Sequence, residues 1–219
     1  MKKRKKVLSK KPLKEDPEYL MDEAELCRKK EEYTKGIDLI SKAIKISPNA
    51  RYYNRRAVLH NSKSRYDDAI KDTTQAIKID PKFALAYANR GHYYYKKGNF
   101  KKAVSDYLKA ISLEPKNDLH YADLAYRYFL EGDYDKALKY YEKASKLKPK
   151  NPKYQFALAD VYAKKKNFDT AIKQCLKAIE LDPMFEEAYE KKTKTENIKL
   201  KYNASVTPKG GMPKEADHD

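Results

Sequence analysis

Residues 144–149 read ASKLKP, and a similar pattern closes four other segments of the chain: AIKISP (43–48), AIKIDP (76–81), AISLEP (110–115) and AIELDP (178–183). The final prolines of these segments are 33, 34, 34 and 34 residues apart. Self-similarity at one fixed period is the signature of stacked repeat units. The sequence therefore predicts five tandem units and not one globular core.

Each unit contains two stretches with helical spacing and a break between them. In the third unit, small and apolar residues recur every three or four positions over 87–94 and again over 103–110. The break reads KGNF (97–100), and 34 residues later EGDY (131–134). Gly and Asn tolerate the left-handed backbone that ends a helix. A short connection makes the two helices antiparallel neighbours, and the proline ends the second helix.

The repeated pattern resembles the tetratricopeptide repeat (TPR). The fourth unit fits it best, through Tyr121, Leu124, Ala125, Tyr128, Gly132, Tyr134, Ala137, Tyr141, Ala144 and Pro149. The third unit has Arg90 in place of Leu, and the second is short before Arg51 and carries one extra residue in its turn. The resemblance implies an all-α protein, a right-handed α-solenoid of stacked antiparallel helix pairs.

The expected organisation follows from the repeats. We expect a basic flexible arm at 1–15, the solenoid at 16–202 and a disordered tail at 203–219. Within the solenoid the repeats fall at about 17–50, 51–83, 84–117, 118–151 and 152–185, and a capping helix follows at about 185–202. Asp16 and Pro17 read as the N-cap and first residue of the first helix.

Composition limits the class of protein. No apolar run approaches the ~20 residues of a membrane span, and the first residues lack the apolar segment of a secretory signal. The 219 residues include only two cysteines, Cys27 and Cys175, which we interpret as small buried hydrophobes. These features favour a soluble, cytoplasmic protein.

The sequence contains no recognisable catalytic constellation. No two of the four histidines are four residues apart, and there is no HExxH, GxSxG or glycine-rich phosphate loop. The acidic residues lie beside lysines on predicted helix surfaces, where solvated ion pairs are usual. We therefore expect a non-catalytic protein that needs no cofactor and no metal.

The resemblance implies a binding groove, because the first helix of each pair lines a concave surface in such solenoids. The side chains placed there are Tyr53, Asn54, Asn89, His92, Tyr95, Asp123, Tyr126, Phe129, Lys153 and Phe156. The two asparagines are able to pair with the backbone of an extended peptide, and the aromatic rings supply apolar contact area. The alternative for each aromatic residue is packing against a neighbouring helix.

Chaperone-binding members of the family clamp an acidic C-terminal tail with five residues: Lys and Asn on one first helix, Asn on the next, Lys and Arg on the third. Each of the three possible windows in this chain keeps only one of the five. A carboxylate held without those cations stays unpaired. The sequence thus disfavours a co-chaperone-like tail binder.

Three hypotheses follow for the function. The first is a protein–protein interaction adaptor or scaffold that binds a peptide segment or helix of another protein in the groove. The second is an accessory protein that binds nucleic acid or acidic surfaces through the basic arm, with Lys2, Lys3, Arg4, Lys5 and Lys6 as its densest part. The third is self-association through the exposed end helices.

Overall fold

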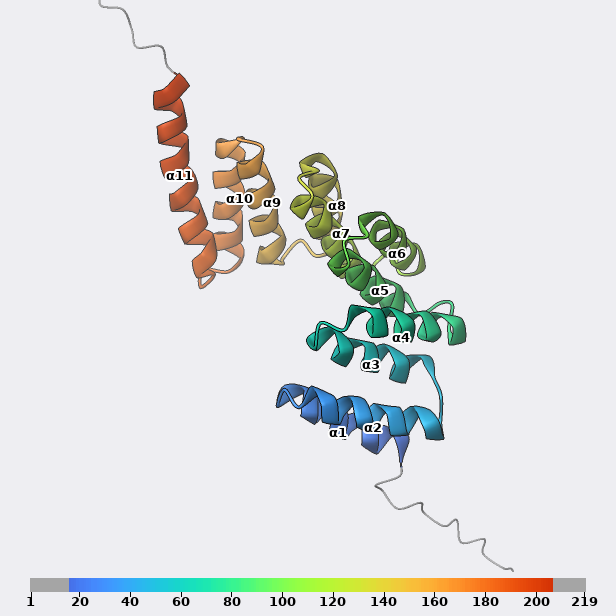
Figure 1. Ribbon diagram of the computed structural model, residues 1–219. Helices are drawn as coiled ribbons and strands as arrows, with labels where there is room; N and C mark the ends of the chain where they lie inside the picture. The colour runs from blue at the N-terminus through green and yellow to red at the C-terminus, as the bar shows by residue number, and fades with distance from the viewer. Residues whose placement is uncertain (1–15, 207–219) are drawn as a thin grey trace, which may run out of the picture. The chain divides into compact units, whose positions relative to one another are not determined.

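The computed structural model describes residues 16–206, and this part of the chain forms eleven α-helices and no strand (Figure 1). Their bounds are α1 Pro17–Lys29, α2 Tyr33–Ile46, α3 Ala50–Ser62, α4 Tyr66–Ile79, α5 Ala84–Lys96, α6 Phe100–Leu113, α7 Asp118–Leu130, α8 Tyr134–Leu147, α9 Pro152–Lys164, α10 Phe168–Leu181 and α11 Glu186–Val206. Helices of 13 and 14 residues alternate from α1 to α10.

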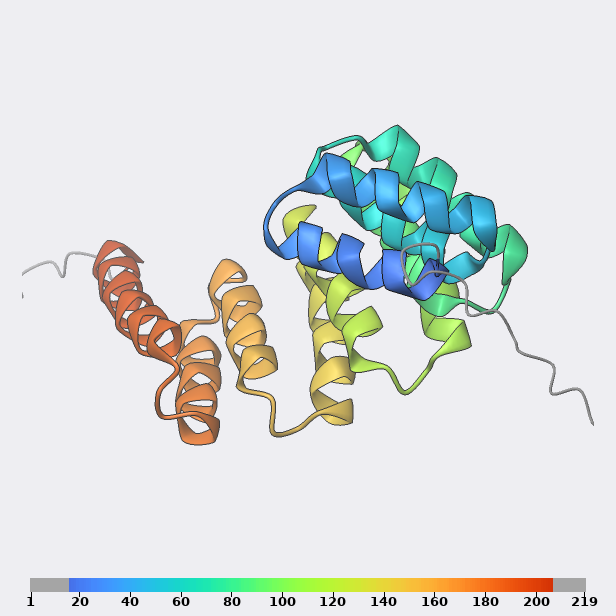
Figure 2. The same cartoon turned by 90° about the horizontal axis from the view of Figure 1, so that it is seen from below.

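The chain divides into two compact units, one ending at His120 and the other beginning at Tyr121. In the first unit α1 packs on α2, α3 on α4 and α5 on α6, and the three hairpins stack through α2 on α3 and α4 on α5. In the second unit α8 packs on α9, α9 on α10 and α10 on α11, and Figure 2 shows α9, α10 and α11 side by side. The predicted all-α solenoid class is confirmed.

All five hairpin turns have the same length and the same kink. Each turn has three residues, and its middle residue has a positive φ: Glu31, Ser64, Gly98, Gly132 and Lys166. This left-handed residue reverses the chain after the first helix, as predicted from the KGNF and EGDY segments. The extra residue predicted in the turn of the second unit is wrong, because residues 63–65 match the other turns.

The second unit of the repeat pattern is short before Arg51, as the sequence predicts. The link between α2 and α3 has three residues (47–49), whereas the later links have four (80–83, 114–117, 148–151 and 182–185). The side chain of Asn49 accepts a hydrogen bond from the backbone N–H of Tyr52 at 3.0 Å and starts α3 at Ala50. The missing residue therefore lies in the link before α3. The repeat position of every residue in α3 shifts by one as a result.

The core follows the predicted alternation of small and large residues. Ala69, Ala103 and Ala137 are fully buried at equivalent positions, and Tyr107 and Tyr141 fill the space beside them. A Cβ atom at the neighbouring helix crossing, on Gly91, would lie 3.0 Å from the carbonyl oxygen of Ala103. Close backbone approach thus depends on small side chains at these crossings.

Two hairpins contain a buried ion pair where the family pattern has Leu. The Arg90 guanidinium donates to both carboxylate oxygens of Asp106 at 2.8 Å, and also to Thr74 of the preceding hairpin at 3.2 Å. Arg56 contacts Asp72 in the same way at 2.7 and 2.8 Å. The hydrogen bonds that they donate to these carboxylates raise the pKa of both guanidinium groups. Each arginine thus gives a buried carboxylate a partner of opposite charge, without which that carboxylate would be buried unpaired.

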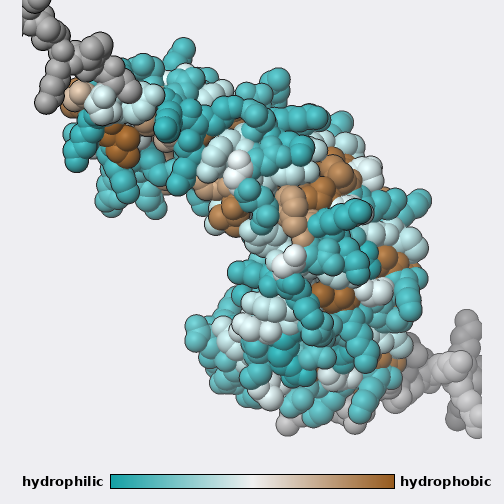
Figure 3. All heavy atoms as spheres, turned by 45° about the horizontal axis from the view of Figure 1, so that its top comes forward, coloured by the Kyte–Doolittle hydropathy of each residue, from teal (hydrophilic) through white to brown (hydrophobic). Residues whose placement is uncertain are grey.

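The last helix is longer than the expected cap. α11 continues to Val206, four residues past the expected end, and residues 207–219 lie outside the described part of the chain. On the face drawn in Figure 3, hydrophobic residues form separate patches within a mostly hydrophilic surface. Across residues 16–206, no helix is both long and apolar enough to cross a membrane.

Candidate functional site

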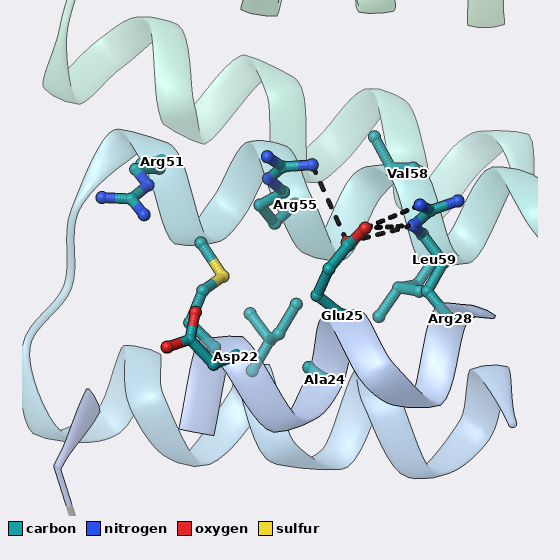
Figure 4. A pocket seen from close by; sticks show the side chains of 10 residues that line it. Asp22, Ala24, Glu25, Arg28, Arg51, Arg55, Val58 and Leu59 are labelled. Carbon is teal, nitrogen blue, oxygen red and sulfur yellow. Dashed lines mark hydrogen bonds and ion pairs between the residues drawn. The ribbon is translucent and has the colours of Figure 1, made fainter. Parts of the chain in front are cut away.

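A cleft of about 70 Å³ lies between α1 and α3, the first helices of the first two repeats (Figure 4). It is lined by Met21, Asp22, Ala24, Glu25, Arg28, Ile40, Arg51, Arg55, Val58 and Leu59. Its apolar residues are buried or half-buried, whereas its charged residues are half-buried or exposed. The cleft therefore has an apolar floor and a charged rim.

Glu25 is the centre of the rim. Arg28, one turn further along α1, donates to it through Nε at 3.0 Å to each oxygen and through Nη2 at 2.6 Å. Arg55 approaches the same carboxylate from α3, with Nη1 3.9 Å from Oε2. The hydrogen bonds from Arg28 lower the pKa of Glu25, so this carboxyl is ionised at neutral pH.

Arg51 and Arg55 are the cations that a ligand would meet. Their side chains are 60% and 50% exposed. Arg51 lies 3.4 Å from Glu18, whose carboxylate also accepts a 2.7 Å hydrogen bond from the hydroxyl of Tyr52. Exposed ion pairs of this kind contribute only about 0–1 kcal/mol each. Both guanidinium groups can therefore exchange their present partners for a carboxylate of a bound protein.

The helix bounds change the set of residues expected on this face. Counted from the start of each helix, Arg51, Arg55 and Val58 occupy the positions that Leu85, Asn89 and His92 occupy in α5. The sequence prediction places Tyr53 and Asn54 in that set. It misses Arg51 and Arg55 because it places an extra residue in the turn after α3, in addition to the shortened link before it. Aligning Ala57 with Gly91 would have revealed the true register.

Tyr53 lies on another side of α3. Its ring is half-buried, and the Arg56 guanidinium lies 5.6 Å from the ring centroid. Tyr87 of α5 has the equivalent relation to Arg90, also at 5.6 Å. This repeated contact belongs to the ion pairs inside the hairpins and not to the cleft.

The two predicted asparagines contact each other. The Asn89 amide donates to the Asn54 side-chain oxygen at 2.9 Å, and Asn54 is only 3% exposed. This hydrogen bond joins α3 to α5. Asn89 is half-buried, and its side-chain oxygen takes no part in this hydrogen bond. Its pairing with a peptide backbone stays a prediction.

His92 and Tyr95 follow Asn89 along α5, and both are half-buried. The His92 ring lies edge-on to Tyr93, with centroids 5.7 Å apart. The Tyr95 ring lies edge-on to Phe100 of α6 at 6.3 Å. Packing therefore accounts for part of each ring, which is the alternative expected for the groove aromatics.

The predicted residues of α7 belong to the second unit and are described within it. Asp123 and Tyr126 are exposed, and the Tyr126 ring lies 5.2 Å from the Arg127 guanidinium. Phe129 is half-buried against Tyr134 of α8, with ring centroids 5.8 Å apart. Tyr126 is the most exposed of the predicted aromatics in this helix.

The two predicted residues of α9, Lys153 and Phe156, differ in their surroundings. Lys153 is exposed at the start of α9, whereas the Phe156 ring packs on Phe185 with centroids 5.2 Å apart. Lys191 of α11 lies 5.5 Å from the Phe156 ring and pairs with Asp160. The Phe156 ring is thus contacted by Phe185, in the link before α11, and by Lys191 of α11.

The chemistry of the remaining candidates is limited. Among residues 16–206 no three His, Cys, Asp or Glu side chains are grouped so that they could hold a metal ion. Cys27 and Cys175 are free and buried. The basic arm, with Lys2, Lys3, Arg4, Lys5 and Lys6, lies outside the described residues.

Comparison with known proteins decides the family. TPR models match residues 59–98, 84–117 and 128–194, which together cover more than half of the chain. The chain belongs to the tetratricopeptide repeat family.

Two curated TPR relatives match short stretches. One is "Small glutamine-rich tetratricopeptide repeat-containing protein 2" of Mycosarcoma maydis, 38% identical over 34% of this chain and 22% of its own length. The other is "Heat-shock protein cognate (HSC) co-chaperone sgt12" of Aspergillus fumigatus, 30% identical over 35% of this chain and 23% of its own length. The matches thus span less than a quarter of either relative.

A solved TPR structure matches most of the chain. It is YrrB, described as "a TPR protein with an unusual peptide-binding site", with a TM-score of 0.61 and 20% identity. The match covers 82% of this chain and 93% of YrrB. At this identity the likeness shows the shared fold.

The helix bounds give new residues for the comparison with the TPR carboxylate clamp. In the first three repeats the five clamp positions hold Met21, Glu25, Arg55, Leu85 and Asn89. None of these is the residue type that the clamp has at that position. Of the two cleft cations, Arg55 therefore lies at a clamp position that has Asn in the family, and Arg51 lies outside the five positions.

Proposed function

We propose that this TPR chain is a non-catalytic adaptor that binds a segment of a partner protein in the cleft between α1 and α3. The observation that carries the proposal is the composition of this cleft. Its apolar floor accepts a side chain, and its two exposed arginines stand beside that floor. Membership in a family of protein-interaction repeats and one relative named as a co-chaperone support a protein as the ligand.

The size of the cleft suggests how the segment is held. A volume of about 70 Å³ equals roughly two to three water molecules at about 30 Å³ each, enough for one short aliphatic side chain. A carboxylate on the same segment then lies near Arg51 and Arg55, which can each give charge-assisted hydrogen bonds. We therefore expect segments that combine an aliphatic residue with a nearby acidic residue.

Selection from a displayed random-peptide library, with the full chain immobilised, tests the proposal even while the partner is unidentified. The selected peptides are then titrated by fluorescence polarisation against wild type and against Arg51→Ala/Arg55→Ala. Loss of two charge-assisted hydrogen bonds, each about 1.5 kcal/mol, predicts a Kd weaker by about two orders of magnitude. Arg65→Ala is the control for losing an exposed arginine outside the cleft, because Arg65 is as exposed as Arg55 and forms a 2.7 Å pair with Asp68 on α4.

The outcomes separate the hypotheses. Selected peptides that bind both the double variant and the control with wild-type affinity would place binding elsewhere and end the proposal. Binding that requires a free C-terminal carboxylate, and disappears when the peptide is amidated, would instead favour the co-chaperone-like tail binder. An adaptor that holds an internal segment binds the amidated peptide equally well.

A further inference from the structure

The positive charge of the second unit is concentrated in one stretch. Residues 121–206 contain 18 Lys and Arg against 13 Asp and Glu. Residues 136–153 alone contain seven lysines and one glutamate. Outside this stretch the unit carries 11 basic and 12 acidic residues, so it is close to neutral. The basic character is therefore a local feature of α8 and of the link that follows it, and not a property of the whole surface.

Four of these lysines form a row on α8. We call Lys136, Lys139, Lys143 and Lys146 the lysine stripe; all four are exposed. Their spacings of three, four and three residues place them on one side of the helix. Lys148, Lys150 and Lys153 are also exposed and continue the charge past the end of α8.

Aromatic rings lie beneath three members of the stripe. Lys136 lies 5.1 Å from the ring of Tyr128, Lys139 lies 5.9 Å from Tyr140, and Lys143 lies 5.7 Å from Tyr121. The Tyr128 and Tyr140 rings are themselves stacked, 5.7 Å apart and nearly parallel. These contacts restrict the lysine stems while leaving each ammonium its charge and its exposure.

Acidic residues near the stripe neutralise little of it. Asp133 pairs with Lys136 at 2.7 Å, and Asp135 is paired with Lys165 of the next hairpin. Glu142 is the one acidic residue of α8 between Lys139 and Lys146. Among the described contacts, Lys139, Lys143 and Lys146 have no carboxylate partner within ion-pair distance.

We propose that the lysine stripe binds the sugar–phosphate backbone of a nucleic acid without regard to sequence. The stripe runs over eleven residues from Lys136 to Lys146, and the ten steps between them span about 15 Å of helix at about 1.5 Å each. One strand of a duplex presents about four phosphates over that length, at about 3.4 Å each along the axis. The number and spacing of the cations thus match a run of phosphates. This site is separate from the α1–α3 cleft and does not depend on the function proposed for it.

The same residues fit other anions less well. The stripe contains no Arg, so it lacks the planar fork that holds a single carboxylate in a fixed geometry; its ammonium groups act as point charges, which suits sequence-independent contacts along a run of phosphates. Insertion into a lipid surface requires exposed apolar side chains beside the cations, and the solvent-facing row of α8 between Lys136 and Lys146 has none. The tyrosine rings are half-buried or buried under the stripe, so base stacking is not part of the proposal.

The test compares two triple variants of the full chain that have equal net charge. The first is Lys139→Gln/Lys143→Gln/Lys146→Gln, and the second is Lys164→Gln/Lys194→Gln/Lys201→Gln, whose lysines are exposed elsewhere in the same unit. Binding to a short fluorescein-labelled DNA duplex and to a labelled RNA single strand is measured by anisotropy at several salt concentrations. The N-terminal basic arm is present in every protein, so its contribution cancels in the comparison.

Loss of three phosphate contacts should flatten the slope of log K against log salt by about 2.7 for the duplex, at about 0.9 per contact. Wild type and control should then lose about 40-fold more affinity than the stripe variant between about 50 and 200 mM salt. Equal slopes for the two triple variants would overturn the proposal. So would a stripe-dependent affinity for polyglutamate or phosphatidylserine vesicles with no stripe-dependent affinity for either nucleic acid. Circular dichroism spectra identical to wild type establish that the variants are folded.

Discussion

The buried pair of Arg90 and Asp106 gives the sharpest test of the packing. Their side chains are 17% and 9% exposed, and two 2.8 Å hydrogen bonds join them. Arg90→Leu removes the cation and leaves Asp106 buried without it. Breaking one partner of a buried pair costs about 3–5 kcal/mol, because the remaining charge stays desolvated. We therefore expect Arg90→Leu to lower the free energy of unfolding by about that amount.

Removing both charges should behave differently. Arg90→Leu/Asp106→Leu replaces the pair with apolar side chains, which is often neutral or stabilising by about 1–4 kcal/mol. The fourth and fifth repeats already have Leu124 and Leu158 at the position of Arg90. The double variant should thus recover most or all of the stability that the single variant loses.

Urea titrations followed by circular dichroism measure these differences, with an exposed pair as the control. Asp68→Ala breaks the ion pair with Arg65, whose side chains are 43% and 50% exposed, and should change stability by less than about 1 kcal/mol. A single variant Arg90→Leu as stable as the control would refute the reasoning. An unfolding slope that differs between variants would show that the repeats no longer unfold together.

Three further predictions concern the turns, a histidine and a cysteine. Gly98→Ala should destabilise the protein by about 1 kcal/mol and Lys166→Gly should stabilise it by a similar amount, since both residues have positive φ; thermal unfolding measures both. Burial lowers the pKa of His60 below its ordinary value of 6.5, so the unfolded chain binds more protons at acid pH. The free energy of unfolding should therefore decrease as the pH falls below 6.5, and His60→Leu should flatten this decrease in urea titrations. Burial raises the pKa of the Cys175 thiol to about 11, so a thiol reagent at mildly alkaline pH should label it in urea but only slowly in the folded protein.

The fold could be predicted from the sequence because the same pattern occurs in all five repeats. A proline spacing, a small residue at each crossing and a left-handed turn residue all recur at one period, and each unit supports the interpretation of the others. Glu31, Ser64 and Lys166 show how strong this redundancy is. They adopt the positive φ that Gly98 and Gly132 adopt, although nothing in their own residue type requires it.

The site was less predictable, because it depends on absolute register. A single missing residue before α3 rotates every following position by about 100°, which exchanges Arg55 for Asn54 on the exposed face. Contacts between repeats add a second obstacle. The hydrogen bond from Asn89 to Asn54 and the cover of Phe156 by Phe185 join residues more than 25 positions apart. Their partners cannot be read from one repeat alone.

The residues that vary between repeats are those with the most freedom to define function. Core positions such as Ala69, Ala103 and Ala137 hold a small residue in every hairpin, Gly36 in the first and Ala in the others, because the same close helix packing recurs in each. Residues on the outer surface are under no such constraint. Arg55 differs from its counterpart Asn89. In the same way the stripe residues Lys139 and Lys146 correspond to Ser105 and Ser112 of α6, at equal distances from the helix start. If packing explained these residues, their counterparts would match. The variant Lys139→Ser/Lys146→Ser/Ser105→Lys/Ser112→Lys exchanges these residues between α8 and α6. It should therefore have the stability of the wild type, and any phosphate-binding activity should move from α8 to α6.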